Sequence, residues 1–190
     1  MFLLLLRKNM SKTIIISGQA GSGKTTLVRK IKDRLKINHE VLFMIGNKKV
    51  YYYKNNHYYI IGKYDGITFG GLDNIKDKSD MIPCIEHIIH IDKDAIILCE
   101  GYIYKKYNWD YKFILYVTLE RRIQNILERR DKSKRSTHKD INIDKEINEH
   151  NRWVKLINNR VDDGYIKLNN NTEEEREANV NIIINTMKGG

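Results

Sequence analysis

Residues 18–25 of this 190-residue chain follow the spacing G-x-x-x-x-G-K-[ST], the Walker A pattern. Glycines let such a loop curl so that successive N–H groups point at one anion, and the helix that begins there adds its positive end. The lysine then reaches the β- and γ-phosphates of a nucleoside triphosphate, and the threonine hydroxyl binds Mg²⁺. The pattern therefore requires a strand that enters the loop and a helix that leaves it.

Both flanks of this Walker A loop have the required character. Residues 13–16 form a β-branched apolar run, and residues 26–35 favour a helix. The four fixed positions would match by chance in roughly one chain of this length in a hundred. We therefore expect a nucleoside triphosphate site rather than a glycine-rich turn without a ligand, and it comprises Gly18, Gln19, Ala20, Gly21, Ser22, Gly23, Lys24, Thr25 and Thr26.

The net charge of +10, from 34 Lys and Arg against 24 Asp and Glu, suits a polyanionic partner such as nucleic acid. The excess of Lys, Asn, Ile and Tyr is also what an AT-rich genome tends to encode. Composition alone leaves both explanations open.

The two cysteines and the N-terminus bear on the compartment. Cys84 and Cys99 do not form a C-x-x-C pair, which indicates free thiols in a reducing compartment. The apolar run at residues 2–6 is too short for a signal peptide or a membrane span. A second methionine, Met10, suggests that residues 1–9 are an extension. We expect a soluble intracellular protein without a membrane partner, in the cytoplasm, or in the host cytoplasm if the chain is viral.

Alternating apolar and helical segments predict one α/β domain over residues 1–190 with three layers. The expected strands of a covered parallel sheet are residues 13–17, 41–45, 95–99, 112–117 and 165–168. Helices are expected at about residues 25–36, 81–90, 119–131, 144–161 and 173–187.

Residues 48–61 contain two β-rich runs around Asn55-Asn56, a pair that tolerates positive φ, and predict a β-hairpin insertion. Five tyrosines lie in it. They are suited to stacking on bases, but β-propensity alone selects the same residues on a half-exposed ribbon.

Two acidic regions are candidates for the chemistry of phosphoryl transfer. Glu100 ends the apolar strand at residues 95–99, where a carboxylate can hold Mg²⁺ or its waters, although a buried strand can also simply end in a charge. The Gly- and Asp-rich segment 62–73 lets the backbone approach a ligand closely. Asp73, or else Asp65, could accept the proton of a substrate hydroxyl there; a solvated turn is the alternative.

Residues 120–135 are rich in arginine. Leu119, Ile123, Ile126 and Leu127 form an apolar stripe, which predicts that the helix packs on the sheet. Arg129 and Arg130 lie off the stripe and could stabilise charge on a transferring phosphoryl group. Residues 129–142 would then form a lid with Arg135 as a further arginine. A solvated basic face is the alternative.

These motifs resemble those of the P-loop kinase superfamily, in the branch of small nucleoside, nucleotide and polynucleotide kinases. The resemblance covers about residues 12–135 and rests on the Walker A loop, Cys99-Glu100-Gly101, and the segment 116–120 followed by Arg129-Arg130. More narrowly, Gly62-Lys63-Tyr64-Asp65 with Phe69-Gly70-Gly71-Leu72-Asp73 is similar to a motif of bacteriophage P-loop kinases. Some of those are nucleotide kinases, and others phosphorylate 5-hydroxymethyluracil in phage DNA. Phage relatives often carry Thr where this chain has Leu72.

The resemblance implies a three-layer α/β/α P-loop kinase fold with about five parallel strands in the order 2-3-1-4-5. It implies transfer of the γ-phosphate of ATP, with Lys24 holding the donor and Thr25 and Glu100 handling Mg²⁺. Asp73 or Asp65 would orient the acceptor, and Arg129 and Arg130 would offset charge.

The same residues bear on the phosphate acceptor and on the classes of nucleotide-binding protein other than kinases. A DNA base, a polynucleotide end and a mononucleotide all fit as acceptors, and we favour nucleic acid because the basic surplus and the tyrosine-rich hairpin agree. A GTPase switch lacks its guanine-reading motif, since Asn47-Lys48-Lys49-Val50 ends in valine instead of aspartate. A motor needs a longer chain, and the Gly- and Asp-rich segment argues against a module that only binds ATP. The oligomeric state is left open.

Overall fold

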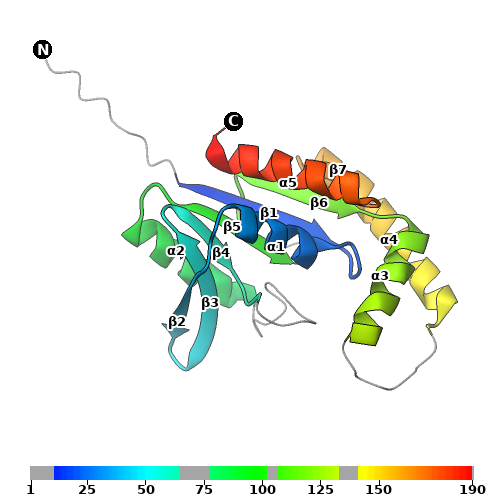
Figure 1. Ribbon diagram of the computed structural model, residues 1–190, viewed down its shortest axis with the longest axis horizontal. Helices are drawn as coiled ribbons and strands as arrows, with labels where there is room; N and C mark the ends of the chain where they lie inside the picture. The colour runs from blue at the N-terminus through cyan, green and yellow to red at the C-terminus, as the bar shows by residue number, and fades with distance from the viewer. Residues whose placement is uncertain (1–10, 65–77, 102–106, 133–140, 190) are drawn as a thin grey trace, which may run out of the picture.

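Strand β1 (Lys12–Gly18) runs through the interior of the sheet, as its consecutive isoleucines predict. The computed structural model describes residues 11–64, 78–101, 107–132 and 141–189. Within these ranges the protein is an α/β fold with one mixed sheet of seven strands and five α-helices (Figure 1). Helices cover both faces of the sheet, so the layers are α/β/α.

The sheet has the order β2-β3-β4-β5-β1-β6-β7. Pairing is parallel from β4 through β5, β1 and β6 to β7, and antiparallel between β2 and β3 and between β3 and β4. The bounds of the other strands are β2 (His39–Ile45), β3 (Lys48–Asn55), β4 (Tyr58–Ile61), β5 (Ile96–Gly101), β6 (Tyr111–Tyr116) and β7 (Ile166–Asn169).

The prediction of a purely parallel five-strand sheet is wrong. Residues 41–45 do form a strand, but β2 lies antiparallel at the edge, because only Gly46 and Asn47 connect it to β3. A parallel connection needs a dozen or more residues, whereas a two-residue turn forms a hairpin. Gly46 has a φ of +58°, which suits that turn. The second parallel strand in chain order is instead β4, and with it the five parallel strands lie in the order 2-3-1-4-5.

The hairpin expected at residues 48–61 is confirmed as β3 and β4. Its turn includes Asn56, which has a φ of +49°, a conformation that asparagine tolerates. Both strands belong to the main sheet rather than to a separate insertion. Three of the hairpin tyrosines are buried in the core of the protein: Tyr52, Tyr53 and Tyr59. For these three, neither stacking on bases nor a place on a half-exposed ribbon holds.

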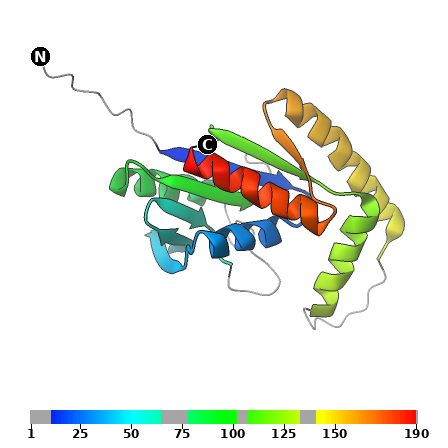
Figure 2. The same cartoon turned by 45° about the horizontal axis from the view of Figure 1, so that its top comes forward.

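The five expected helices are all present, close to the predicted bounds. Helices α1 (Lys24–Arg34) and α5 (Glu173–Lys188) lie side by side on one face (Figure 2), joined by ion pairs from Lys30 and Arg34 to Glu177. Helices α2 (Met81–Ile91) and α4 (Ile143–Asp162) cover the other face, and a short 3₁₀ turn, Lys78–Asp80, precedes α2.

The isoleucines of β1 divide between two cores, because successive side chains of a strand point to opposite faces. Ile15 packs with residues of α2 and α4, while Ile14 and Ile16 pack with residues of α1 and α5. All three are fully buried. Burying each such side chain contributes about 1.5–3 kcal/mol, so this strand anchors both layers at once.

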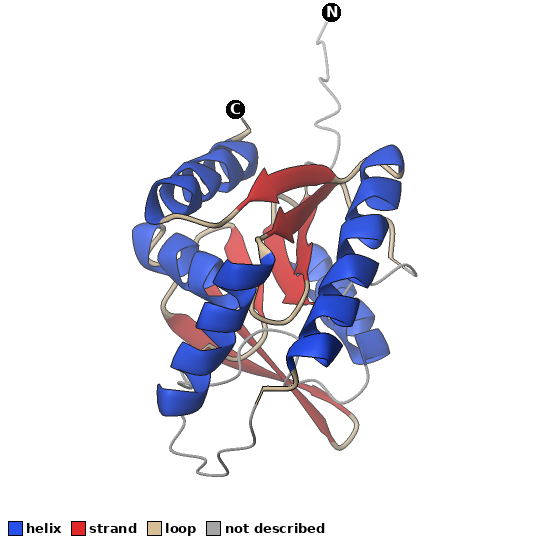
Figure 3. Cartoon of the chain, turned by 90° about the vertical axis from the view of Figure 1, so that its right-hand side faces the viewer, coloured by secondary structure: helices blue, strands red, loops and turns tan. Residues whose placement is uncertain are grey.

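Helix α3 (Leu119–Lys132) does not pack on the sheet as its apolar stripe predicts. It packs mainly against α4 and against the Walker A loop, where a Cβ added to Gly21 would lie 3.2 Å from Ile126. Leu127 is 46% exposed, whereas Arg122 is buried. Figure 3 views this end of the molecule, where α3 and α4 stand before the carboxyl ends of the strands.

Both cysteines are free and buried, which confirms the expectation of free thiols. Burial raises the pKa of the Cys84 thiol to about 12 and the pKa of Cys99 well above its usual range. Throughout the described ranges, every helix is too short or too polar to cross a bilayer.

Candidate phosphate-binding site

The Walker A loop leaves the carboxyl end of β1 and turns directly into α1, with little room for side chains along its backbone. Gly21 and Gly23 have φ values of +81° and +85°. A Cβ at Gly18 would lie 2.5 Å from the Ser22 hydroxyl, and one at Gly23 would lie 2.6 Å from the Asn170 side-chain nitrogen. The loop is therefore a narrow backbone cradle that only glycine permits at these positions.

The positive end of α1 and the Lys24 ammonium lie at this cradle. Gly23 is the N-cap, and the first turn of α1 carries no acidic side chain that would offset the positive end of the helix. The Nζ atom of Lys24 donates to the carbonyl oxygens of Gly18 at 2.9 Å and Gln19 at 3.1 Å. An anion at the loop would thus meet backbone N–H groups, a helix N-terminus and an ammonium group together.

Thr25 and Glu100 place two oxygen ligands beside the loop. The Thr25 hydroxyl donates to a Glu100 carboxylate oxygen at 2.8 Å. Glu100 is 1% exposed, because β5 pairs with β1 and sets it opposite Ile16. In the described part of the chain, no group of three or more His, Cys, Asp or Glu could hold a metal. A Mg²⁺ ion here would fit as it does in phosphate sites, with one or two protein oxygens plus water and phosphate oxygens.

Arg122 braces the loop from α3. Its guanidinium, 1% exposed, donates from Nε to the carbonyl oxygen of Ala20 at 3.2 Å. It also donates to the backbone carbonyl of Glu146 at 3.2 Å and forms ion pairs with the carboxylates of Glu146 and Glu149 on α4. One buried cation therefore ties α3 and α4 to the Walker A loop.

His150, one turn after Glu146 on α4, makes a second contact with the loop. Its Nδ1 lies 3.3 Å from the side-chain nitrogen of Gln19, an arrangement in which the amide would donate to an Nδ1 without a proton. Burial lowers the pKa of His150 from 6.5 and the Arg122 charge lowers it further, while Glu120 opposes them. This contact therefore requires the neutral imidazole.

Two asparagines satisfy further carbonyl groups of the loop. The Asn125 side chain donates to Gly21 at 2.7 Å, and the fully buried Asn170 side chain donates to Ser22 at 2.7 Å. Asn170 follows β7, and its side-chain oxygen Oδ1 accepts a hydrogen bond from the side-chain nitrogen of Asn179 on α5 at 3.3 Å. Arg122, Asn125 and Asn170 thus satisfy the backbone carbonyl groups of Ala20, Gly21 and Ser22, three consecutive residues of the loop.

The predicted site residues fall into two groups. Lys24, Thr25 and Glu100 come together at the carboxyl edge of β1 and β5. Asp65, Asp73 and Arg135 lie outside the described residues, as does the side chain of Arg130, and Arg129 is exposed on α3. The arginine that contacts the loop is Arg122.

Sequence reasoning missed Arg122, Asn125, His150 and Asn170. Arg122 carried a signal, since it belongs to one of the arginine pairs of its helix. Nothing in the sequence marks which of these pairs turns toward the loop, because that depends on how α3 packs. Asn170 lies directly after a strand that ends at the same edge, which is where loop-contacting polar residues collect.

No protein-family model matches this chain, and no curated protein matches it. The loop pattern and the geometry around it are therefore the features that bear on function.

Proposed function

We propose that this protein is an ATP-dependent phosphotransferase that transfers the γ-phosphate to a hydroxyl group of a nucleic acid. The acceptor would be a polynucleotide end or a base such as 5-hydroxymethyluracil in DNA. The observation that supports it best is the Walker A cradle with the Thr25–Glu100 pair beside it. The basic surplus of the chain supports a polyanionic acceptor.

The residues of the site would divide the work as follows. Loop N–H groups and Lys24 hold the donor phosphates, while Thr25 and Glu100 would hold Mg²⁺, which neutralises phosphate charge when bound. Asp73 or Asp65 takes the proton of the acceptor hydroxyl. The acceptor oxygen then bonds to the γ-phosphorus as the bond to the ADP oxygen breaks. Positioning and electrostatics supply the acceleration, with Arg129, Arg130 and Arg135 as candidates to offset charge.

A (deoxy)nucleoside monophosphate kinase is the second candidate, because the same donor site serves a small acceptor equally well. A GTPase-type switch is disfavoured by the missing guanine-reading motif. The two kinases differ in salt dependence, since a nucleic-acid acceptor releases counterions from several phosphates and a mononucleotide carries one.

The test is to incubate the protein with γ-labelled ATP and Mg²⁺ and to offer mononucleotides, DNA ends and hydroxymethylated duplex separately. We expect label in a nucleic acid and a loss of about 100-fold or more for Lys24→Ala. Lys93→Ala, an exposed lysine in the turn before the amino end of β5, is the matched control and should transfer at the wild-type rate. Wild-type transfer by Lys24→Ala, or no label in any acceptor, would refute the proposal.

A further inference from the structure

Most of the segment that forms β2, β3 and β4 is basic. Residues 41–64 contain four lysines, Lys48, Lys49, Lys54 and Lys63, and no aspartate or glutamate. The chain has 24 acidic residues among 190, which corresponds to about three in a stretch of this length. One of the four, Lys48, forms an ion pair with Asp80 at 2.8 Å. The basic surplus of the protein is therefore partly concentrated in one structural unit.

Strand pairing shows where this unit lies. Ile61, the last residue of β4, pairs with Cys99 of β5 and with Tyr52 of β3. The strands β2 and β3 continue past that row, up to the pair of Ile45 and Lys48. They therefore form a two-stranded ribbon that extends beyond the carboxyl end of β4 and projects from the sheet (Figure 1). Glu100 and the Walker A loop lie at the carboxyl ends of the parallel strands β5 and β1.

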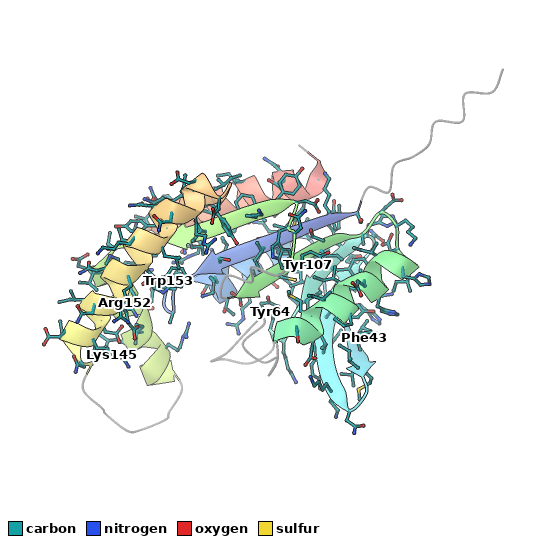
Figure 4. All side chains as sticks on the ribbon, turned by 180° about the vertical axis from the view of Figure 1, so that it is seen from behind. Phe43, Tyr64, Tyr107, Lys145, Arg152 and Trp153 are labelled. Atoms are coloured by element: carbon teal, nitrogen blue, oxygen red, sulfur yellow. The ribbon has the colours of Figure 1, made fainter. Side chains whose placement is uncertain are left out.

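The two faces of this ribbon differ. On one face, Phe43 of β2 (labelled in Figure 4) stacks on His87 of α2 with ring centroids 4.5 Å apart, and Val50 beside it is buried. The other face is open to solvent. There Leu42 and Met44 are 45% and 47% exposed.

The exposed face combines apolar and basic side chains. Leu42 lies directly opposite Tyr51, and Met44 lies opposite Lys49. The Nζ atom of Lys63 lies 4.7 Å from the centre of the Tyr51 ring. Glu40 lies on the same side of β2 as Leu42 and Met44, opposite Tyr53, and it accepts a hydrogen bond from the Tyr53 hydroxyl at 2.7 Å. We call the face formed by Leu42, Met44, Lys49, Tyr51 and Lys63 the ribbon face.

We propose that the ribbon face binds a single-stranded segment of the nucleic-acid acceptor. Lysines neutralise backbone phosphates, and apolar and aromatic side chains cover the faces of bases. A duplex hides its base faces within the stack, so the exposed Leu42 and Met44 beside Tyr51 suit unpaired bases. The ribbon and the Walker A loop both extend beyond the carboxyl ends of the parallel strands, so a strand bound to the ribbon would lie on the side of the sheet where the donor binds. The inference rests on the proposed function for the identity of the reaction, but strand binding can be measured without it.

A second copy of the chain is the competing occupant, because β2 is an edge strand with unpaired backbone groups. Charge argues against it. Two copies of the ribbon face would bring Lys49 and Lys63 of one copy against the same lysines of the other, and none of the five residues of that face is a carboxylate. A polyanion meets the same lysines favourably.

The experiment measures the anisotropy of a fluorescein-labelled, mixed-sequence DNA strand of about 20 nucleotides without nucleotide present. Lys49→Glu and Lys63→Glu should each weaken binding about tenfold, and the log–log salt slope should become shallower by about 0.7 for each phosphate that the variant no longer neutralises. Lys93→Glu introduces the same charge change in the turn before the amino end of β5, away from the ribbon face. This variant should bind the strand as the wild type does. Leu42→Ser should also weaken binding, while circular dichroism stays unchanged.

Three results would overturn the inference. The first is wild-type binding by both Lys49→Glu and Lys63→Glu, and the second is tighter binding of the matched duplex than of the single strand. The third is a wild-type dimer in sedimentation that Met44→Glu dissociates, which would make the ribbon face a contact between copies. The proposed function is tested separately. A wild-type protein that binds the strand but transfers no phosphate would refute the kinase activity and would still support strand binding by the ribbon face.

Discussion

Replacing Arg122 by methionine should lower the stability of the protein and also weaken the ATP binding that we propose for the Walker A loop. The guanidinium is buried between α3, α4 and the Walker A loop, and methionine keeps much of the volume without the charge. The change leaves the Glu146 carboxylate, which is 13% exposed, without its cation and removes the donor to the Ala20 carbonyl.

The magnitude follows from these interactions. Removing one partner of a buried ion pair costs about 3–5 kcal/mol. The lower end applies here because Glu149, the second carboxylate, is 41% exposed and can be solvated. We expect a decrease of about 3 kcal/mol in the free energy of unfolding, or a fall in Tm of about 6–12 °C for a chain of this size. Arg122→Lys should recover only part of this stability, since an ammonium cannot make the same fork of hydrogen bonds.

Urea unfolding followed by circular dichroism measures the first effect, and titration with a fluorescent ATP analogue measures the second. Arg121→Met is the matched control, because Arg121 is the neighbouring arginine and its guanidinium donates to Gln124 of its own helix. It should change stability by about 0.5 kcal/mol or less. If Arg122→Met lowers the stability no more than Arg121→Met does, Arg122 does not stabilise the contact of α3 and α4 with the loop. The full decrease in stability with unchanged ATP affinity would show that the brace does not position the loop.

Three further changes test other parts of the structure. Cys84 and Cys99 should not react with a disulfide reagent at neutral pH in the native state and should react in denaturant, because burial raises both pKa values; fast native labelling would contradict their burial. His150 has a lowered pKa, so the unfolded chain binds its proton more tightly, and stability should be retained above about pH 6.5 and fall as the pH drops through the folded value. His150→Gln should make that fall shallower in urea unfolding at successive pH values, and an equal fall would exclude His150 as its cause. Gly23→Ala should lower stability by about 1–3 kcal/mol in thermal unfolding, since its φ is +85° and the new Cβ would lie 2.6 Å from Asn170; an unchanged Tm would show that the loop yields.

Local patterns were enough to predict most of the elements. The five helices, the strand before the loop and the hairpin around Asn56 follow from short-range periodicity and turn residues, which act within a few positions of the chain. The direction of β2 could also have been read, because Gly46-Asn47 between two β-rich runs is a hairpin signal. Treating residues 41–45 as a separate parallel strand overlooked that turn.

The Walker A loop can be recognised without any tertiary contact, because glycine spacing, a lysine and a hydroxyl residue specify its backbone and its charge locally. The residues that surround the loop depend on how distant segments pack. Glu100 reaches Thr25 only because β5 pairs with β1, and Arg122, His150 and Asn170 reach it only because α3, α4 and β7 end at the same edge. These hydrogen bonds join residues about 75 to 150 positions apart, and no periodicity within one segment reports on them.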